Sequence, residues 1–158
     1  MRLTQINLQP YFGGGEVYTA FLSRALAELG VPTRLLAHPQ ARFWQTLSLP
    51  DSLRIEVIAD AHKLPEFIAA EDRWLLSHGP MPAALLAASA RAEHLLTAIA
   101  HMPVQGRNPA VFAGHDMVFP VSSWVREGLL AAGLPTWSQP LYGLANLDPS
   151  PPKFSESI

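Results

Sequence analysis

The stretch LTQINLQPYFGGGEVYTAFLSRALAELG, residues 3–30, begins as a strand and ends as a helix. Residues 3–8 are predicted to form a strand and residues 9–15 a glycine-rich loop. From Glu16 onward apolar residues recur at intervals of three and four, which is the spacing of an α-helix. Glu16 in the first turn complements the helix dipole, and Gly30 followed by Pro32 is a stop signal. The apolar positions of this helix are Val17, Phe21, Leu22, Ala25, Leu26 and Leu29.

The same alternation of short apolar runs and helical patterns continues along the chain. Pro82 suits the first position of a helix, and Ser122 or Ser123 caps another. Such alternation predicts an α/β domain of three layers, with helices on both faces of a mostly parallel sheet of about six or seven strands. The domain is expected to cover residues 1–146, with 147–158 as a linker or tail. Further strands are predicted at residues 33–37, 54–58, 74–77, 95–100, 117–121 and 137–142, and further helices at 64–70, 82–94 and 123–132.

The composition is that of a folded chain without strong charge. Of the 158 residues, 49% are hydrophobic and 15% are charged, which excludes a disordered chain. The formal net charge is −2 and the Lys and Arg residues are scattered, so no nucleic-acid partner is expected. The sequence has no cysteine, no signal peptide and no apolar run of roughly 20 residues, so we expect a cytoplasmic protein.

Glycine and polar residues gather where the predicted strands end. The carboxyl ends of parallel strands lie at one edge of a sheet, and ligands bind in the crevice beyond them. The convergence of several segments on this edge indicates a site more strongly than any single motif. These residues are Gly13, Gly14 and Gly15; His78 and Gly79; His101; Ser122 and Ser123; and Tyr142 and Gly143.

The three consecutive glycines open directly into the first predicted helix. Their backbone N–H groups, with no side chains in the way, suit a phosphate or another anion, and a flexible turn is the alternative. The glycines lack the G-x-G-x-x-G spacing of a dinucleotide-binding loop, and no acidic residue for a ribose follows residues 33–37. No Gly-Lys-Ser/Thr follows either, which excludes a Walker loop.

Two histidines, His78 and His101, stand at predicted strand ends. The His101 imidazole is a candidate to hydrogen-bond an acceptor hydroxyl or a phosphate. A core histidine satisfied by the protein is the alternative for both residues. His115 and Asp116 are adjacent and would point to opposite faces of a strand, so we expect no joint role. No histidine pair has helical metal-ligand spacing, and no metal site is expected. Three histidines are interpreted as surface residues: His38, His62 and His94.

Several segments follow one another as in a known family. YFGGGE (residues 11–16) leads into a helix that continues as LSRALAELG (22–30). WLLSHG (74–79) and TAIAH (97–101) each end a strand in a histidine, and VFPVSSWVREGLLAAG (118–133) joins a strand to a serine-capped helix. Together with LYG (141–143), nearly the whole chain resembles the N-terminal, Rossmann-like domain of retaining glycosyltransferases with the GT-B fold (glycosyltransferase family 4-like).

The resemblance implies that a sugar is transferred from a nucleotide-sugar donor to an acceptor hydroxyl, with retention and without a metal or other cofactor. The process would be polysaccharide or glycolipid synthesis, with a sugar or lipid-linked acceptor bound on the side of this domain. The implied catalytic residue is His101, which contacts the acceptor or the transferred sugar. The other implied site residues are Gly13, Gly14 and Gly15 near the donor diphosphate, and Tyr11, Glu16 and His78 at the acceptor.

The chain also departs from the family's pattern. GLANLD (143–148) stands where the family has Asn-Gly-Val-Asp, and the donor-binding second domain with its paired glutamates is not in this sequence. We therefore expect this chain alone to be inactive. A non-catalytic Rossmann-like binding module is the alternative. Because many members act on lipid-linked acceptors, we also expect peripheral contact with the inner face of the membrane, through Arg42, Phe43 and Trp44.

Overall fold

A computed structural model of the chain describes residues 2–89 and 94–143. These residues form a six-stranded, all-parallel sheet with the order β3-β2-β1-β4-β5-β6. This is the strand order of a Rossmann domain, and it confirms the predicted α/β, Rossmann-like three-layer fold. The strands are β1 (Leu3–Asn7), β2 (Thr33–Ala37), β3 (Arg54–Val57), β4 (Trp74–His78), β5 (Leu95–Ala100) and β6 (Met117–Pro120).

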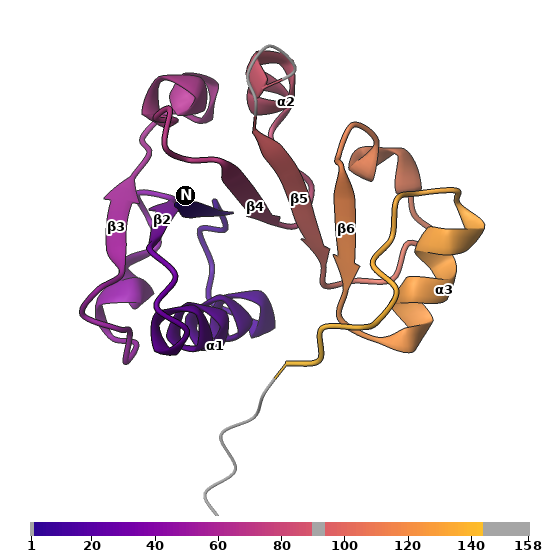
Figure 1. Cartoon of the computed structure of the whole chain (residues 1–158), viewed down its shortest axis with the longest axis horizontal. Coiled ribbons are helices and arrows are strands. Elements are labelled where there is room, and N and C mark those ends of the chain that lie inside the picture. The colour runs from indigo at the N-terminus through magenta and orange to yellow at the C-terminus, as the bar shows by residue number, and fades with distance from the viewer. Residues whose placement is uncertain (1, 90–93, 144–158) are drawn as a thin grey trace, which may run out of the picture.

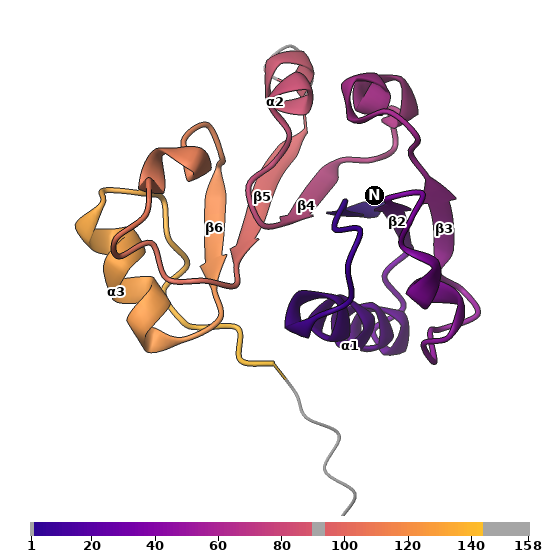
Figure 2. The same cartoon turned by 180° about the vertical axis from the view of Figure 1, so that it is seen from behind.

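Helices cover both faces of the sheet, as Figures 1 and 2 show from opposite sides. One face carries α1 (Gly14–Glu28) and the short 3₁₀-helix η1 (Arg42–Gln45). The other face carries the 3₁₀-helix η2 (Ala61–Phe67) and α2 (Ala83–Ser89), which contact each other. The 3₁₀-helix η3 (Pro109–Phe112) and α3 (Ser123–Ala131) pack beside β5 and β6 on this same face.

The layer formed by η2, α2, η3 and α3 is held to the sheet by apolar contacts. Every second residue of the strands points into it, as the pleat of a strand requires. Burying each Val, Leu, Ile, Phe or Met side chain there stabilises the fold by about 1.5–3 kcal/mol. One cluster comprises Ile6, Leu36, Ile58, Leu64, Leu75, Met81, Leu85 and Leu96, and the other comprises Ala98, Ala100, Val104, Phe112, Val118, Val125 and Leu129.

Polar groups, in contrast, join the start of α1 to β1. Gln5 Nε2 donates a hydrogen bond to Ser23 Oγ at 2.8 Å. Asn7 Nδ2 donates to Thr19 Oγ1 at 2.9 Å and to Glu16 Oε1 at 3.2 Å. All five of these residues are buried. We call them the β1–α1 polar seam, and they decide which side of α1 faces the sheet.

The apolar periodicity of α1 therefore does not mark its buried side. Leu26 packs in the core, but Leu29 is 76% exposed and Val17 is 37% exposed. The amides of Gln5 and Asn7 need partners when buried, and serine, threonine and glutamate on α1 provide them. The helix is consequently turned so that its polar residues lie inward.

Two predicted elements differ from the structure. Residues 137–142 do not form a strand; an isolated parallel bridge joins Thr136 to Val118, and the Leu141 N–H donates to the Pro120 carbonyl at 2.7 Å. The ladder does not continue beyond this bridge, because Pro120 of β6 has no N–H to donate to the Trp137 carbonyl. The predicted α-helix at 64–70 is the 3₁₀-helix η2, which contains Pro65 and ends at Phe67.

Some predictions fall on parts of the chain that the structure does not describe. Residues 90–93, in the second half of the helix predicted at 82–94, lie outside the described residues. The boundary at residue 146 and the tail at 147–158 lie outside them too. Within the described ranges, no helix is long and apolar enough to cross a bilayer.

A buried ion network closes the amino-terminal edge of the sheet. Asp72, just before β4, is fully buried and contacts Arg34, while Arg2 Nε donates to its Oδ1 at 2.5 Å. Arg34 also donates to Thr4 Oγ1 at 3.1 Å and pairs with Glu56 at 3.2 Å. Burial raises the pKa of Asp72, but hydrogen bonds from Arg2 and a backbone N–H, with the charge of Arg34, outweigh it and lower the pKa below its usual value.

We expect Asp72→Ala to lower the free energy of unfolding by about 3–5 kcal/mol, because buried Arg34 loses its buried counter-ion. The matched control Glu71→Ala removes only an exposed partner of Arg2 and should cost less than about 1 kcal/mol. Because the folded-state pKa of Asp72 is lowered, its stabilisation is present above the usual value of 3.8 and is lost as the pH falls through the folded value. Urea denaturation measures both effects, and equal losses in the two variants would contradict the buried network.

Candidate ligand-binding site

A cavity of about 550 Å³ opens at the carboxyl ends of β1, β4 and β5. Between β1 and β4 the strand order reverses, because β1 connects to β2 on one side and β4 connects to β5 on the other. The two connections leave the sheet in opposite directions, and open parallel sheets bind ligands in the crevice at such a point. The volume is that of a site for a small organic ligand.

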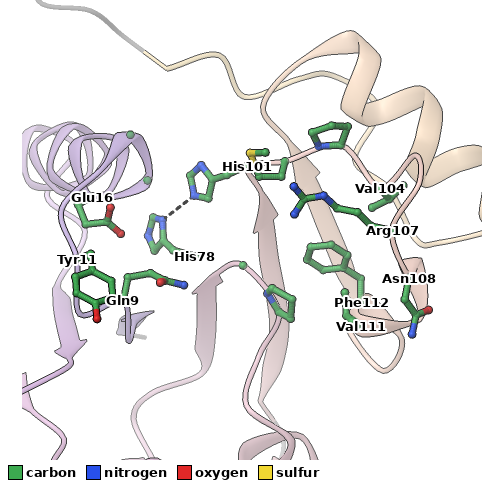
Figure 3. A pocket seen from close by; sticks show the side chains of 16 residues that line it. Gln9, Tyr11, Glu16, His78, His101, Val104, Arg107, Asn108, Val111 and Phe112 are labelled. Atoms are coloured by element: carbon green, nitrogen blue, oxygen red, sulfur yellow. Dashed lines mark hydrogen bonds between the residues drawn. The ribbon is translucent and has the colours of Figure 1, made fainter.

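Three segments of the chain form the walls of the cavity (Figure 3). The loop after β1 and the start of α1 form one wall, and the ends of β4 and β5 lie between the two side walls. The segment after β5 forms the opposite wall, with Arg107 and Asn108 beside apolar Val104, Val111 and Phe112. The cavity therefore combines apolar surface with a few polar groups, as ligand sites do.

His78 and His101 meet at the wall of the cavity. His78 Nδ1 and His101 Nε2 lie 3.3 Å apart, and the two rings are inclined by only 16°. On the other side of its ring, His78 Nε2 lies 2.8 Å from Gln5 Oε1. Tyr18 of α1 stands edge-on to His101, with the ring centroids 5.1 Å apart. Through Gln5, the histidine pair joins the β1–α1 polar seam.

Both histidines are neutral near neutral pH. Burial lowers the pKa of His78 to about 3, and the neighbouring His101 lowers it further in the same direction. Burial lowers the pKa of His101 to about 4. The cavity thus presents two uncharged imidazoles rather than a cation.

Gly14 and Gly15 leave the start of α1 open to the cavity. Neither has a positive φ. A Cβ added at Gly14 would meet nothing within 4 Å, and one at Gly15 would meet only the His101 ring at 3.9 Å. Local conformation and packing therefore do not require glycine at these positions. The first N–H groups of a helix have no partner within the helix, and here no side-chain hydrogen bond caps them.

The structure brings most of the predicted site residues to this one cavity. Of the residues that the resemblance implies, only Gly13 does not line it; it is the N-cap of α1 in extended backbone. Of the other strand-end residues, Gly79 lines the cavity, whereas Ser122, Ser123, Tyr142 and Gly143 do not. The roles assigned to them stay predictions. Ser122 is a helix cap as predicted, and its Oγ accepts from the Val125 N–H at 3.2 Å. The predicted residues that line the cavity are Tyr11, Gly14, Gly15, Glu16, His78 and His101.

The other histidines lie apart from this cavity. His115 is buried beside the Phe112 carbonyl, and His62 is exposed. His94, interpreted as a surface residue, is half-buried and its Nδ1 lies 2.7 Å from the Asp72 carbonyl oxygen. In the part of the chain that the structure describes, no three His, Asp or Glu side chains gather as metal ligands would.

Several residues at the site were missed by sequence reasoning. Gln5 and Asn7 gave one signal, because polar side chains inside a central strand must find partners when buried. Gln9, Arg107 and Asn108 also line the cavity but lie in segments without periodicity. Only the fold places them beside the histidines.

Trp44 cannot make the membrane contact predicted for it. Trp44 is 4% exposed and packs with Leu35, Ala37 and Ala41, because η1 turns its ring into the core. Two exposed aromatic residues, Tyr11 and Phe12, lie in the loop after β1. Tyr11 in this loop is 80% exposed and lines the cavity, and its exposed neighbour Phe12 packs on Phe43 of η1.

We expect the free energy of unfolding to fall as the pH drops below about 6.5, before Asp72 titrates. His78 and His101 have lower pKa values in the folded state, so between 6.5 and these values the unfolded chain binds more protons. The stabilisation is complete above 6.5 and decreases below it. Urea denaturation across this range measures the slope, which should be smaller in His101→Phe and unchanged in the exposed control His62→Asn. An unchanged slope in His101→Phe would contradict the lowered pKa.

Three comparisons with known proteins bear on this site. No family model matched the chain. Searches of curated proteins and of solved structures also gave no match. The geometry of the cavity and the sequence resemblance are therefore the observations that bear on its function.

Proposed function

We propose that this chain is the N-terminal, acceptor-side half of a glycosyltransferase, which moves a sugar from a nucleotide-sugar donor to an acceptor hydroxyl in polysaccharide or glycolipid synthesis. One observation carries the proposal. At the switch point of a Rossmann-like sheet, an uncovered helix start and a neutral histidine pair face the same cavity. The order of sequence features that resembles the GT-B glycosyltransferases supports it independently.

In this proposal the start of α1 receives the donor diphosphate. Backbone N–H groups at a helix start attract phosphate oxygens, and the absence of side chains at Gly14 and Gly15 allows close approach. Glu16 lies in the same first turn: Oε1 accepts from Asn7 and Oε2 lies near Gly13, so its carboxylate opposes the diphosphate electrostatically, and the backbone N–H groups of the start of α1 have to outweigh it. The base and ribose of the nucleotide would be bound by a second domain across the cavity.

His101 contacts the acceptor or the transferred sugar in this proposal. It lines the cavity, and the Gly15 backbone lies beside its ring. During transfer, the bond from the anomeric carbon to the diphosphate oxygen breaks, the acceptor oxygen bonds to that carbon, and the acceptor proton passes to the departing diphosphate oxygen. A polar group held at this point can stabilise the charge that develops as the bond breaks.

The loop after β1 would meet the aglycone of the acceptor. Tyr11 and Phe12 expose aromatic rings there, and Tyr11 lines the cavity. Aromatic rings with one polar edge suit the boundary between a sugar and a lipid chain. A lipid-linked acceptor would explain exposed apolar surface at this position, with peripheral contact at the cytoplasmic face of a membrane.

We expect this chain alone to bind simple glycosides weakly in the cavity and to have little affinity for nucleotide sugars. A glycoside needs only the walls of this cavity, whereas the nucleotide base would lack its binding site. Ligand-observed NMR with methyl glycosides and with common nucleotide sugars measures both. Tight binding of a nucleotide sugar by this chain would contradict the acceptor-side assignment. Binding of glycosides without any transfer by the complete protein would favour the non-catalytic binding module.

We expect His101→Ala to lower turnover by the complete enzyme roughly 10²-fold, the usual order for one positioned polar group. The free energy of unfolding should fall by only about 1 kcal/mol, because one hydrogen bond of a half-buried ring is lost. Turnover per folded molecule and urea denaturation on the same variant separate the two effects. A strongly destabilised variant with near-normal turnover would show that His101 serves the core.

A further inference from the structure

A continuous chain of hydrogen bonds connects α1 to the cavity through two histidines. Ser23 Oγ lies 2.8 Å from the Thr19 carbonyl oxygen, and Gln5 Nε2 lies 2.8 Å from Ser23 Oγ. Gln5 Oε1 lies 2.8 Å from His78 Nε2, and His78 Nδ1 lies 3.3 Å from His101 Nε2. Figure 3 marks the last contact with a dashed line.

The Thr19 carbonyl, at the α1 end of this series of hydrogen bonds, determines the direction of every bond in the series. A backbone carbonyl only accepts, so the Ser23 hydroxyl donates to Thr19 and accepts from Gln5. The Gln5 amide group that faces Ser23 is therefore NH₂, and the oxygen faces His78. His78 must then donate from Nε2, which leaves Nδ1 as an acceptor.

His78 in turn determines the form of His101. Because His78 Nδ1 accepts, the proton between the rings is on His101 Nε2. A neutral imidazole carries one N–H, so Nδ1 of His101 has a lone pair. In the described part of the chain, no hydrogen-bond partner contacts that nitrogen, and the ring lines the cavity.

We propose that the Gln5–His78 chain fixes His101 as the Nε2–H tautomer, so that His101 Nδ1 accepts a hydrogen bond from a hydroxyl group of the ligand and does not bind its phosphate. Gln5, His78 and Ser23 are positioning residues, which act through His101. The protein fixes this tautomer of His101 whichever ligand it binds. The use of Nδ1 on a sugar hydroxyl rests on the proposed function.

The surroundings of the two rings are consistent with a neutral pair. Burial lowers the pKa of both histidines. The Tyr18 ring stands edge-on to both histidines, and its hydroxyl donates to the Leu141 carbonyl at 2.8 Å. Burial also raises the pKa of Tyr18, so this ring adds no charge. The nearest carboxylate on the seam, Glu16, accepts from Asn7.

Nitrogen NMR of the imidazole rings in this chain tests the tautomer directly, because protonated and unprotonated ring nitrogens resonate far apart. His78 and His101 should both show a protonated Nε2 and an unprotonated Nδ1. His115 is an internal control with the opposite pattern, because its Nδ1 donates to the Phe112 carbonyl at 3.0 Å and its Nε2 accepts from the Met81 N–H at 3.4 Å. A protonated Nδ1 on His101 would overturn the proposal.

Two variants test whether Gln5 is the cause. Gln5→Glu keeps an acceptor for His78 and should preserve the tautomer of His101. Gln5→Met has a similar shape without an acceptor, so the two nitrogens of His101 should move to averaged, intermediate shifts. An unchanged His101 spectrum in Gln5→Met would overturn the role of Gln5. The wild-type measurement stands even if Gln5→Met does not fold.

Two probes test what Nδ1 binds. A methyl glucoside at high concentration carries hydroxyl donors and should shift the His101 Nδ1 resonance. Inorganic sulfate carries only acceptor oxygens and should leave that resonance in place. A response to sulfate, or no response to the glucoside, would overturn the hydroxyl contact while leaving the tautomer intact. Both results are independent of whether the complete enzyme transfers a sugar.

Discussion

The hydrogen bonds from Gln5 and Asn7 into α1 are the constraint on which the rest of the site depends. Two amide side chains in the interior of the central strand lose water on folding, and leaving either unpaired would cost about 1–3 kcal/mol. Glu16, Thr19 and Ser23 satisfy them only if α1 is turned with its polar side inward. That rotation brings the glycines at the start of α1 to the cavity and leaves Val17 and Leu29 exposed.

The same two residues also shape the cavity. Asn7 Oδ1 accepts from the Gln9 N–H at 3.2 Å, which holds the beginning of the loop over β1. Gln5 contacts His78 across the β1–β4 pair, at the point where the strand order reverses. One network of polar hydrogen bonds therefore positions the loop after β1, the start of α1 and the two histidines together.

The sequence predicts the sheet well and the site only in part. Residues 33–37 and 95–100 are short apolar runs, as doubly covered parallel strands are, and the strands have these bounds. The rotation of α1 could not be predicted, because apolar spacing usually marks the buried side and polar pairing overrides it here. The contact of His78 with His101 depends on register. His78 lies opposite Ile99 in the β4–β5 pair, so His101, two residues later, follows on the same face.

The electrostatics of the cavity separate two kinds of ligand group. Charging either histidine is unfavourable because burial lowers both pKa values, so the imidazole side of the cavity does not attract anions. The start of α1 attracts anions through backbone N–H groups that do not titrate. A ligand with a diphosphate at one end and hydroxyls at the other is thereby oriented in one direction. The histidines have to stay neutral for this, and their burial by the polar seam keeps them so.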